Sequence, residues 1–157
     1  MIGALHRWLW GLFQRHLRLG LNLYPPYLGT GITVTEISDD FRSIRVQMPL
    51  RFYNRNYVGT HFGGSLYSMC DPFFMLMVIK NLPAGHVVWD KEARIRFIRP
   101  GRGTMQAHFQ ITEADLDALR AGLEKEGTAE RVFSVDVTDG ERLVARVDKR
   151  IYARRER

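Results

Sequence analysis

Residues 63–81, with the sequence GGSLYSMCDPFFMLMVIKN, form a long segment that is apolar nearly all round. A helix without a polar face has to be covered by other structure on every side. Segments with the pattern of β-strands precede and follow it. The sequence therefore predicts an α+β architecture in which a curved antiparallel β-sheet wraps around one central helix.

The segments on both sides of 63–81 alternate apolar and polar residues with a period of two. Such alternation is typical of antiparallel strands with one buried face, because parallel strands are covered on both faces and show continuous apolar runs. Ser38, Asp39 and Asp40 separate the first two segments and predict a hairpin. The expected strands cover 32–34, 44–48, 93–97, 105–111, 133–137 and 143–147. Charged residues alternate with the core positions and are expected on the outer face of the sheet: Arg94, Arg96, Arg146 and Arg150.

A second helix is predicted from Glu113 to Glu126, between the fourth and fifth strands. Thr112 and Asp115 have capping-box spacing at its start, and Gly127 is a suitable stop. Its apolar stripe consists of Leu116, Leu119 and Leu123.

The first 20 residues predict an amphipathic helix that ends at Gly20, with a stripe of Leu5, Trp8, Leu9, Leu12, His16 and Leu19. The prolines of Tyr24-Pro25-Pro26-Tyr27 then predict an extended connector, so that residues 1–28 form an N-terminal segment and residues 29–157 the main domain. Two interpretations of the helix stay open. It packs on its own domain or on a partner subunit, or it makes a weak contact with an anionic membrane surface. The longest apolar run, 8–13, is too short to span a bilayer.

Composition limits the class of protein. The 157 residues include one cysteine, Cys70, so an internal disulfide is excluded and a reducing, cytoplasmic compartment is expected. Cys70 lies in an apolar segment beside an acid, which disfavours a reactive thiolate. The net charge of +6 favours an anionic partner, but no motif points to nucleic acid and we expect none to bind.

Asp71 is the only charged residue between Gly64 and Ile79. A carboxylate in a segment enclosed on every side is costly unless it is paired or its pKa rises, so Asp71 is a candidate for proton transfer or nucleophilic attack. The alternative is that Asp71 caps a shorter helix beginning at Pro72. Both can hold, since Pro72 would also kink a continuous helix just past the acid.

Adjacent glycines, Gly63 and Gly64, precede the apolar segment within the loop 59–65. Without side chains they allow backbone N–H groups at a helix start to approach a ligand closely. This predicts an oxyanion hole, with a flexible turn as the alternative. The acid seven residues after Gly64 makes the functional interpretation more specific.

These residues resemble the hotdog-fold superfamily, in particular the phenylacetyl-CoA type of acyl-CoA thioesterase. That type carries the pattern Asn-x-x-Gly-Thr-x-His-Gly-Gly, followed by six residues and an acid on the central helix. The positions that match are Asn56, Gly59, Thr60, Gly63, Gly64 and Asp71. Residues 98–100 also resemble the family's stretch after the third strand. The resemblance covers about residues 29–152, and within it the chain is similar to an uncharacterised, domain-of-unknown-function branch.

Two features depart from the family pattern. Phe62 occupies the histidine position, and His61 stands one place earlier, where its side chain should point elsewhere. His61 is a candidate catalytic residue, with an ordinary loop histidine as the alternative. The helix 113–126 is longer than the usual connection in the family, and we expect it to cover a pocket mouth or a subunit contact.

The resemblance implies hydrolysis of an acyl-CoA or related acyl thioester by a homodimer or a dimer of dimers, with no metal and no cofactor besides the coenzyme A of the substrate. It places the thioester carbonyl against the N–H of Gly63 or Gly64, with Asp71 of the opposing subunit activating water or attacking directly. Asn56 would hold the water or the carbonyl, or act only as a turn residue. Further substrate contacts are expected from Phe62, Ser65, Tyr67, Arg99 and Arg102, the two arginines binding the phosphates of coenzyme A. The alternative function is a non-catalytic protein that binds acyl-CoA or fatty acid.

Overall fold

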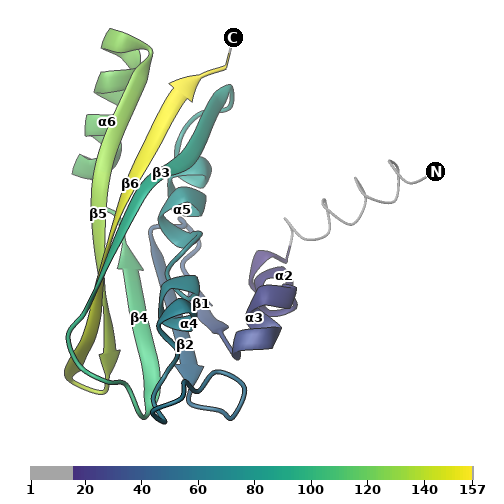
Figure 1. Ribbon diagram of the computed structural model, residues 1–157. Helices are drawn as coiled ribbons and strands as arrows, with labels where there is room; N and C mark the ends of the chain where they lie inside the picture. The colour runs from purple at the N-terminus through teal and green to yellow at the C-terminus, as the bar shows by residue number, and fades with distance from the viewer. Residues whose placement is uncertain (1–15, 157) are drawn as a thin grey trace.

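The computed structural model of the protein describes residues 16–156, and its sheet has six antiparallel strands. Their order across the sheet is β1-β2-β4-β5-β6-β3, so β1 and β3 form the two edges. The sheet curves around two short helices (Figure 1), which confirms the predicted α+β architecture. The strands are β1 Thr33–Ile37, β2 Ser43–Pro49, β3 His86–Phe97, β4 Thr104–Gln110, β5 Thr128–Asp139 and β6 Arg142–Arg155.

The strands pair antiparallel, as the alternation of apolar and polar residues predicts. β1 and β2 form the expected hairpin, in which Ile37 pairs with Ile44. β3 is longer than the predicted 93–97, because its first part pairs with the end of β6, where His86 lies opposite Arg155. An irregularity between Asp90 and Glu92 interrupts the period of two, and this is why the alternation did not predict the first part of β3.

The central helix is divided, which corrects the prediction of one helix over residues 63–81. Helix α4, Gly63–Ser68, and helix α5, Phe73–Asn81, are separated by a turn that contains Pro72. Pro72 has no N–H to donate, so the series of helical hydrogen bonds cannot continue through it. Helix α5 is held on the sheet by aromatic contacts: the Phe74 ring stacks on that of Phe133 with centroids 5.0 Å apart.

Helix α6, Glu113–Glu126, has the predicted bounds and the predicted capping box between Thr112 and Asp115. Its three stripe leucines are buried. β4 pairs with β5 only along residues 105–107, and α6 lies beside the part of β5 that β4 does not reach (Figure 1).

Two short helices, α2 Leu17–Asn22 and α3 Pro25–Thr30, precede the sheet. The prediction that the first helix ends at Gly20 is wrong, because the chain stays helical to Asn22. The predicted extended connector is wrong as well, because Pro25 starts α3, and a proline is well tolerated in the first turn of a helix. Leu17, Leu21 and Tyr27 join the core.

Of the residues in the predicted amphipathic stripe, only His16 and Leu19 lie within the described range. Leu19 is 58% exposed, and His16 is also exposed, so these two positions do not pack on the domain. Leu5, Trp8, Leu9 and Leu12 lie outside the described residues. Among the helices of residues 16–156, none is both long and apolar enough to cross a bilayer.

The outer face of the sheet carries the arginines that the alternation assigned to it. Arg146 pairs with Asp136 of β5 through two hydrogen bonds of 2.6 and 2.7 Å. Arg150 contacts Glu92 of β3 at 3.0 Å.

Candidate active site beside the central helix

The loop between β2 and α4 is organised by Asn56. Its backbone N–H donates to the Thr60 carbonyl at 2.7 Å, and its side-chain amide donates to Thr60 Oγ1 at 2.8 Å. Its Oδ1 accepts from the Thr60 N–H at 2.9 Å. Gly59, at the tip, has a φ of 81°, which glycine adopts without strain. Asn56 therefore closes the turn that presents the following residues.

A hollow of about 360 Å³ lies between this loop and the end of β3. Its loop side carries four residues, three of which belong to the matched motif: Asn56, Thr60, His61 and Gly63. The opposite side comes from residues 97–101, including Phe97 and Arg99. The structure thus brings together a motif and an arginine that are more than thirty positions apart in the sequence.

Gly63 and Gly64 form the first turn of α4, with Phe62 at the N-cap. No hydrogen bond among residues 16–156 is donated by the N–H of either glycine. A Cβ on Gly63 would come within 3.0 Å of the Phe97 ring, and one on Gly64 within 2.4 Å of the Phe62 ring. Gly63 therefore leaves an unpaired donor at the wall of the hollow, and Gly64 leaves a second one beside it in the same turn, with one aromatic ring against each glycine.

His61 is buried, at 3% exposure, beside the loop that Asn56 closes. Its Nε2 lies 2.9 Å from the Gly103 carbonyl oxygen, which requires a proton on Nε2. Nδ1 is buried, and no partner for it lies in the described part of the chain. Burial lowers the pKa of His61, although the contact with Gly103 opposes this. His61 thus presents a neutral ring to the hollow.

The two arginines expected to bind phosphate lie on either side of a turn after β3. Arg99 lines the hollow that contains the motif. It also lines a second hollow, of about 220 Å³, and there Arg102 and Arg142 lie beside it. Arg99 Nη1 donates to the Leu143 carbonyl at 3.1 Å. Asp139 lies in the same second hollow and contacts Arg142 at 3.2 Å. Arg99 therefore connects the hollow that contains the motif to a neighbouring hollow lined by Arg102 and Arg142.

Asp71 is not enclosed on every side, contrary to the expectation for this segment. It lies on the turn between α4 and α5, and its side chain is 53% exposed. It does not cap α5 either, since that helix has no side-chain cap. Instead, Asp71 Oδ1 accepts from the Tyr67 hydroxyl at 2.9 Å and from Lys149 Nζ at 3.0 Å. The division of the central helix at Pro72 creates this turn and so exposes the acid.

Sequence reasoning missed Lys149 of β6, which is a partner of Asp71, and Asp90 of β3, which shares that lysine. The Lys149 side chain is fully buried, and its Nζ also lies 3.0 Å from Asp90 Oδ2. Burial by itself lowers the pKa of Lys149, but its hydrogen bonds to Tyr67, Asp90 and Asp71 outweigh this and leave the pKa raised. The alternation along β6 could have predicted that Lys149 points inward, because it stands between the inward positions Val147 and Ile151.

The remaining candidate residues lie at the start, in the middle and at the end of α4. Phe62 is at the start of the helix and 56% exposed. Ser65 is buried within it and does not line the hollow. Tyr67 belongs to the Asp71 cluster at the other end. A six-residue helix is about 9 Å long, so Asp71 and the glycine pair of the same chain lie at opposite ends of α4.

Cys70 is fully buried in the turn beside Asp71. Burial raises the pKa of its thiol far above the ordinary value. This agrees with the expectation that the cysteine is not a nucleophile.

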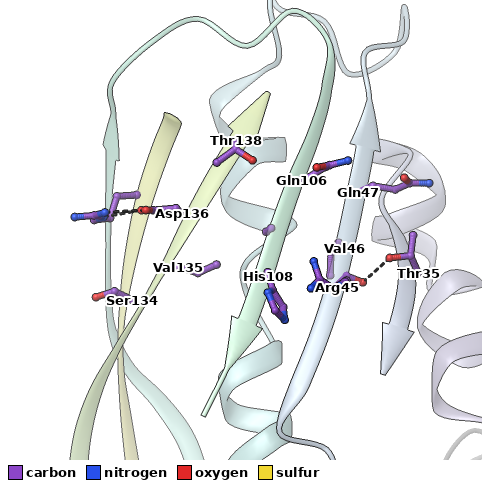
Figure 2. A pocket seen from close by; sticks show the side chains of 12 residues that line it. Thr35, Arg45, Val46, Gln47, Gln106, His108, Ser134, Val135, Asp136 and Thr138 are labelled. Atoms are coloured by element: carbon purple, nitrogen blue, oxygen red, sulfur yellow. Dashed lines mark hydrogen bonds and ion pairs between the residues drawn. The ribbon is translucent and has the colours of Figure 1, made fainter. Parts of the chain in front are cut away.

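A larger hollow, of about 510 Å³, lies on the outer face of the sheet where β4 and β5 diverge (Figure 2). Its charged side chains are already paired: Arg146 with Asp136, and Arg45 with Glu36 at 3.2 Å. His108 is 2.8 Å from Ser43 Oγ. This hollow contains no residue of the matched motif, so the candidate site is the smaller one beside α4.

Comparison with known proteins places the chain in a family. Residues 14–153 match the family model described as "Domain of unknown function (DUF4442)". The protein belongs to the DUF4442 family. A search of the curated proteins gives no match for this DUF4442 protein.

Solved structures similar to this DUF4442 protein share its fold at low identity. Protein PA5026 of Pseudomonas aeruginosa, of unknown function and described as a "probable thioesterase", has a TM-score of 0.77 and 19% identity, over 90% of this chain and 93% of that one. Thioesterase HI1161 of Haemophilus influenzae has a TM-score of 0.65 and 15% identity, over 90% of each chain. A mutant form of thioesterase PA1618 of Pseudomonas aeruginosa has a TM-score of 0.66 and 10% identity, over 89% of this chain and 93% of that one. The fold of the DUF4442 protein is the hotdog fold that its motif predicts.

Proposed function

We propose that this DUF4442 protein hydrolyses acyl-CoA or a related acyl thioester. The observation that carries the proposal is the hollow beside α4, which gathers His61, Gly63 and Arg99 and is bordered by the unengaged N–H group of Gly63. A volume of about 360 Å³ lies within the range of small-ligand pockets. The thioester carbonyl oxygen would accept from the N–H of Gly63 or Gly64, with the coenzyme A phosphates toward Arg99 and Arg102.

The reaction needs a base or a nucleophile, and Asp71 is our candidate. In the first form, a water oxygen bonds to the thioester carbon while Asp71 takes one water proton. The C–S bond then breaks, and the leaving thiolate takes that proton. In the second form, the carboxylate itself attacks the thioester carbon and the C–S bond breaks, which gives a mixed anhydride and a thiolate. Water then cleaves the anhydride, which regenerates the Asp71 carboxylate, and a proton released in this step goes to the thiolate. A positioned base contributes roughly 10²–10⁴ in rate, and one oxyanion donor about 2.7–4 kcal/mol of barrier.

We propose that the active site is completed by a second copy of the chain, whose Asp71 faces the glycine pair. This proposal is supported by the separation of Asp71 from that pair along α4 within one chain. It is also supported by β3, which pairs with β6 on one side and forms an edge of the sheet along its twelve residues. Phe62, Phe97 and Ile98 are exposed apolar side chains near this edge. A long edge strand with apolar neighbours is a template for another strand.

Release of free thiol from acyl-CoA esters of short to long chain length tests the activity. Asp71→Asn should abolish hydrolysis while the circular dichroism spectrum stays that of the folded protein. Asp39→Asn, on the exposed turn between β1 and β2, is the matched control and should keep the wild-type rate. An unchanged rate in Asp71→Asn would remove this residue from the mechanism.

Mixing two inactive variants tests the shared site. Asp71→Asn lacks the acid, and Gly63→Leu fills the hollow, so only a mixed dimer holds one intact site. Random exchange of subunits should restore about a quarter of the wild-type activity. A monomer by light scattering at all concentrations, together with no recovery, would contradict the dimeric arrangement.

A non-catalytic acyl-CoA or fatty-acid binder is the second candidate. The specific observation in its favour is Phe62, which stands at the family's histidine position and is apolar and half exposed. Titration with acyl-CoA that saturates without thiol release would favour the binder, whereas turnover would favour the hydrolase.

A further inference from the structure

A buried ammonium group lies behind the candidate acid. Lys149 projects from the inward face of β6 between Val147 and Ile151, and the side chains of all three residues are 0% exposed. Taking a cation out of water is costly unless its hydrogen bonds and its charge are satisfied. An inward lysine in a strand of otherwise apolar inward residues therefore needs a specific reason.

All three donors of the ammonium find oxygen acceptors. Lys149 Nζ lies 3.0 Å from Asp71 Oδ1, 3.0 Å from Asp90 Oδ2 and 3.1 Å from the Tyr67 hydroxyl. The partners come from the turn after α4, from β3 and from α4 itself. The cluster joins the central helix to the sheet, and it contains one cation and two carboxylates.

The two oxygens of Asp71 have different surroundings. Oδ1 accepts both from Lys149 and from the Tyr67 hydroxyl, which lies 2.9 Å away. Among the hydrogen bonds of residues 16–156, none reaches Oδ2. Since the side chain is 53% exposed, Oδ2 is the oxygen that can meet water or substrate.

We propose that Lys149 is a positioning residue, which holds the Asp71 carboxylate by Oδ1, so that Oδ2 performs the chemistry. This inference rests on the proposed thioesterase function and deepens it. Asp90 is the counterpart in the proposal: it competes with Asp71 for the same ammonium and so weakens the hold on the acid.

The separate values of kcat and KM distinguish positioning from a merely structural role. Lys149→Met removes the donor to Oδ1, so kcat should fall by about 10- to 100-fold while KM changes little. Lys149→Arg keeps a charged donor and should recover part of kcat. Lys125→Met, on an exposed face of α6, is the matched control and should leave both constants unchanged.

Asp90→Asn keeps the buried lysine and removes its other anionic partner. Lys149 should then hold Asp71 at least as strongly, so kcat should stay at the wild-type value or rise. This variant decides the question if Lys149→Met does not fold. A tenfold or larger loss of kcat in Asp90→Asn would overturn the proposal.

The carboxyl ¹³C signal of Asp71, assigned with Asp71→Asn, reports the contact with Lys149 without turnover. Its chemical shift at pH 7 should change in Lys149→Met and stay in place in Lys125→Met. If the wild type hydrolyses no thioester, the proposed function fails, while this signal still decides whether Lys149 holds the acid. If Asp71→Asn is inactive but Lys149→Met keeps the wild-type kcat and carboxyl signal, the function stands and the positioning role is wrong.

Discussion

The Nζ atom of Lys149 and the Oδ1 atom of Asp71 lie 3.0 Å apart, although the two residues are separated by 78 positions in the sequence. The lysine comes from β6, and the acid from the turn that divides the central helix. Asp90 of β3 shares the same ammonium. The candidate acid is therefore tied to the sheet through one buried cation.

Removing both carboxylates should destabilise the protein far more than removing either one. Asp71→Asn or Asp90→Asn leaves Lys149 with one anionic partner, so each should cost about 1 kcal/mol or less of unfolding free energy. The double variant leaves a buried ammonium with none, which costs about 3–5 kcal/mol. Urea unfolding at pH 7 measures the difference, and strictly additive costs would contradict the shared ion pair.

His61 should make stability depend on pH. Its folded-state pKa is lowered, mainly by burial, so below the ordinary value of about 6.5 the unfolded chain binds more protons than the folded one. Stability should therefore fall as pH drops below that value, by at most about 1.4 kcal/mol per pH unit.

The histidine variants locate this effect. Unfolding free energies between pH 5.5 and 7 should show a smaller slope in His61→Asn. His108 also has a pKa lowered by burial, so His108→Gln measures its separate share. A slope in His61→Asn equal to that of the wild type would contradict the contribution of His61.

Arg99 and Arg102 should affect the binding of coenzyme A more than the chemical step. Because exposed ion pairs are worth little, Arg99→Gln or Arg102→Gln should raise KM for acyl-CoA by about two- to fivefold with little change in kcat. An N-acetylcysteamine thioester lacks the nucleotide and should be hydrolysed unchanged. Arg96→Gln on the outer face of β3 is the matched control. Equal losses on both substrates would contradict phosphate binding.

The Cys70 thiol should be unreactive in the folded protein. The side chain is 0% exposed and burial raises its thiol pKa, so a thiol reagent should label it only after unfolding in urea. Cys70→Ala should keep thioester hydrolysis. Rapid labelling of the native protein, or loss of turnover in this variant, would point to a reactive thiol.

Local patterns predicted the parts of the fold that depend on near neighbours. The capping box at Thr112 and Asp115 lies three residues apart, and the structure begins α6 there. The β1–β2 hairpin needs one turn, which the sequence contains at Ser38. The motif Asn56 to Gly64 lies within nine residues, and those of its members that line the hollow come together in one loop.

Other features followed from contacts that no short window contains. The first part of β3 is a strand because it pairs with the end of β6. The prolines at Pro25 and Pro26 permit an extended chain or a first helical turn, and here they start α3, whose Tyr27 is buried in the core.

By itself, the sequence determined the alternating strands, the capped helix α6, the glycine motif and the presence of an acid after it. Only the tertiary structure decided that this acid is half exposed and bound to a buried lysine. The physical reason is that side-chain alternation assigns Lys149 to the inner face of the sheet, whereas strand register and the turn at Pro72 decide which groups meet it there.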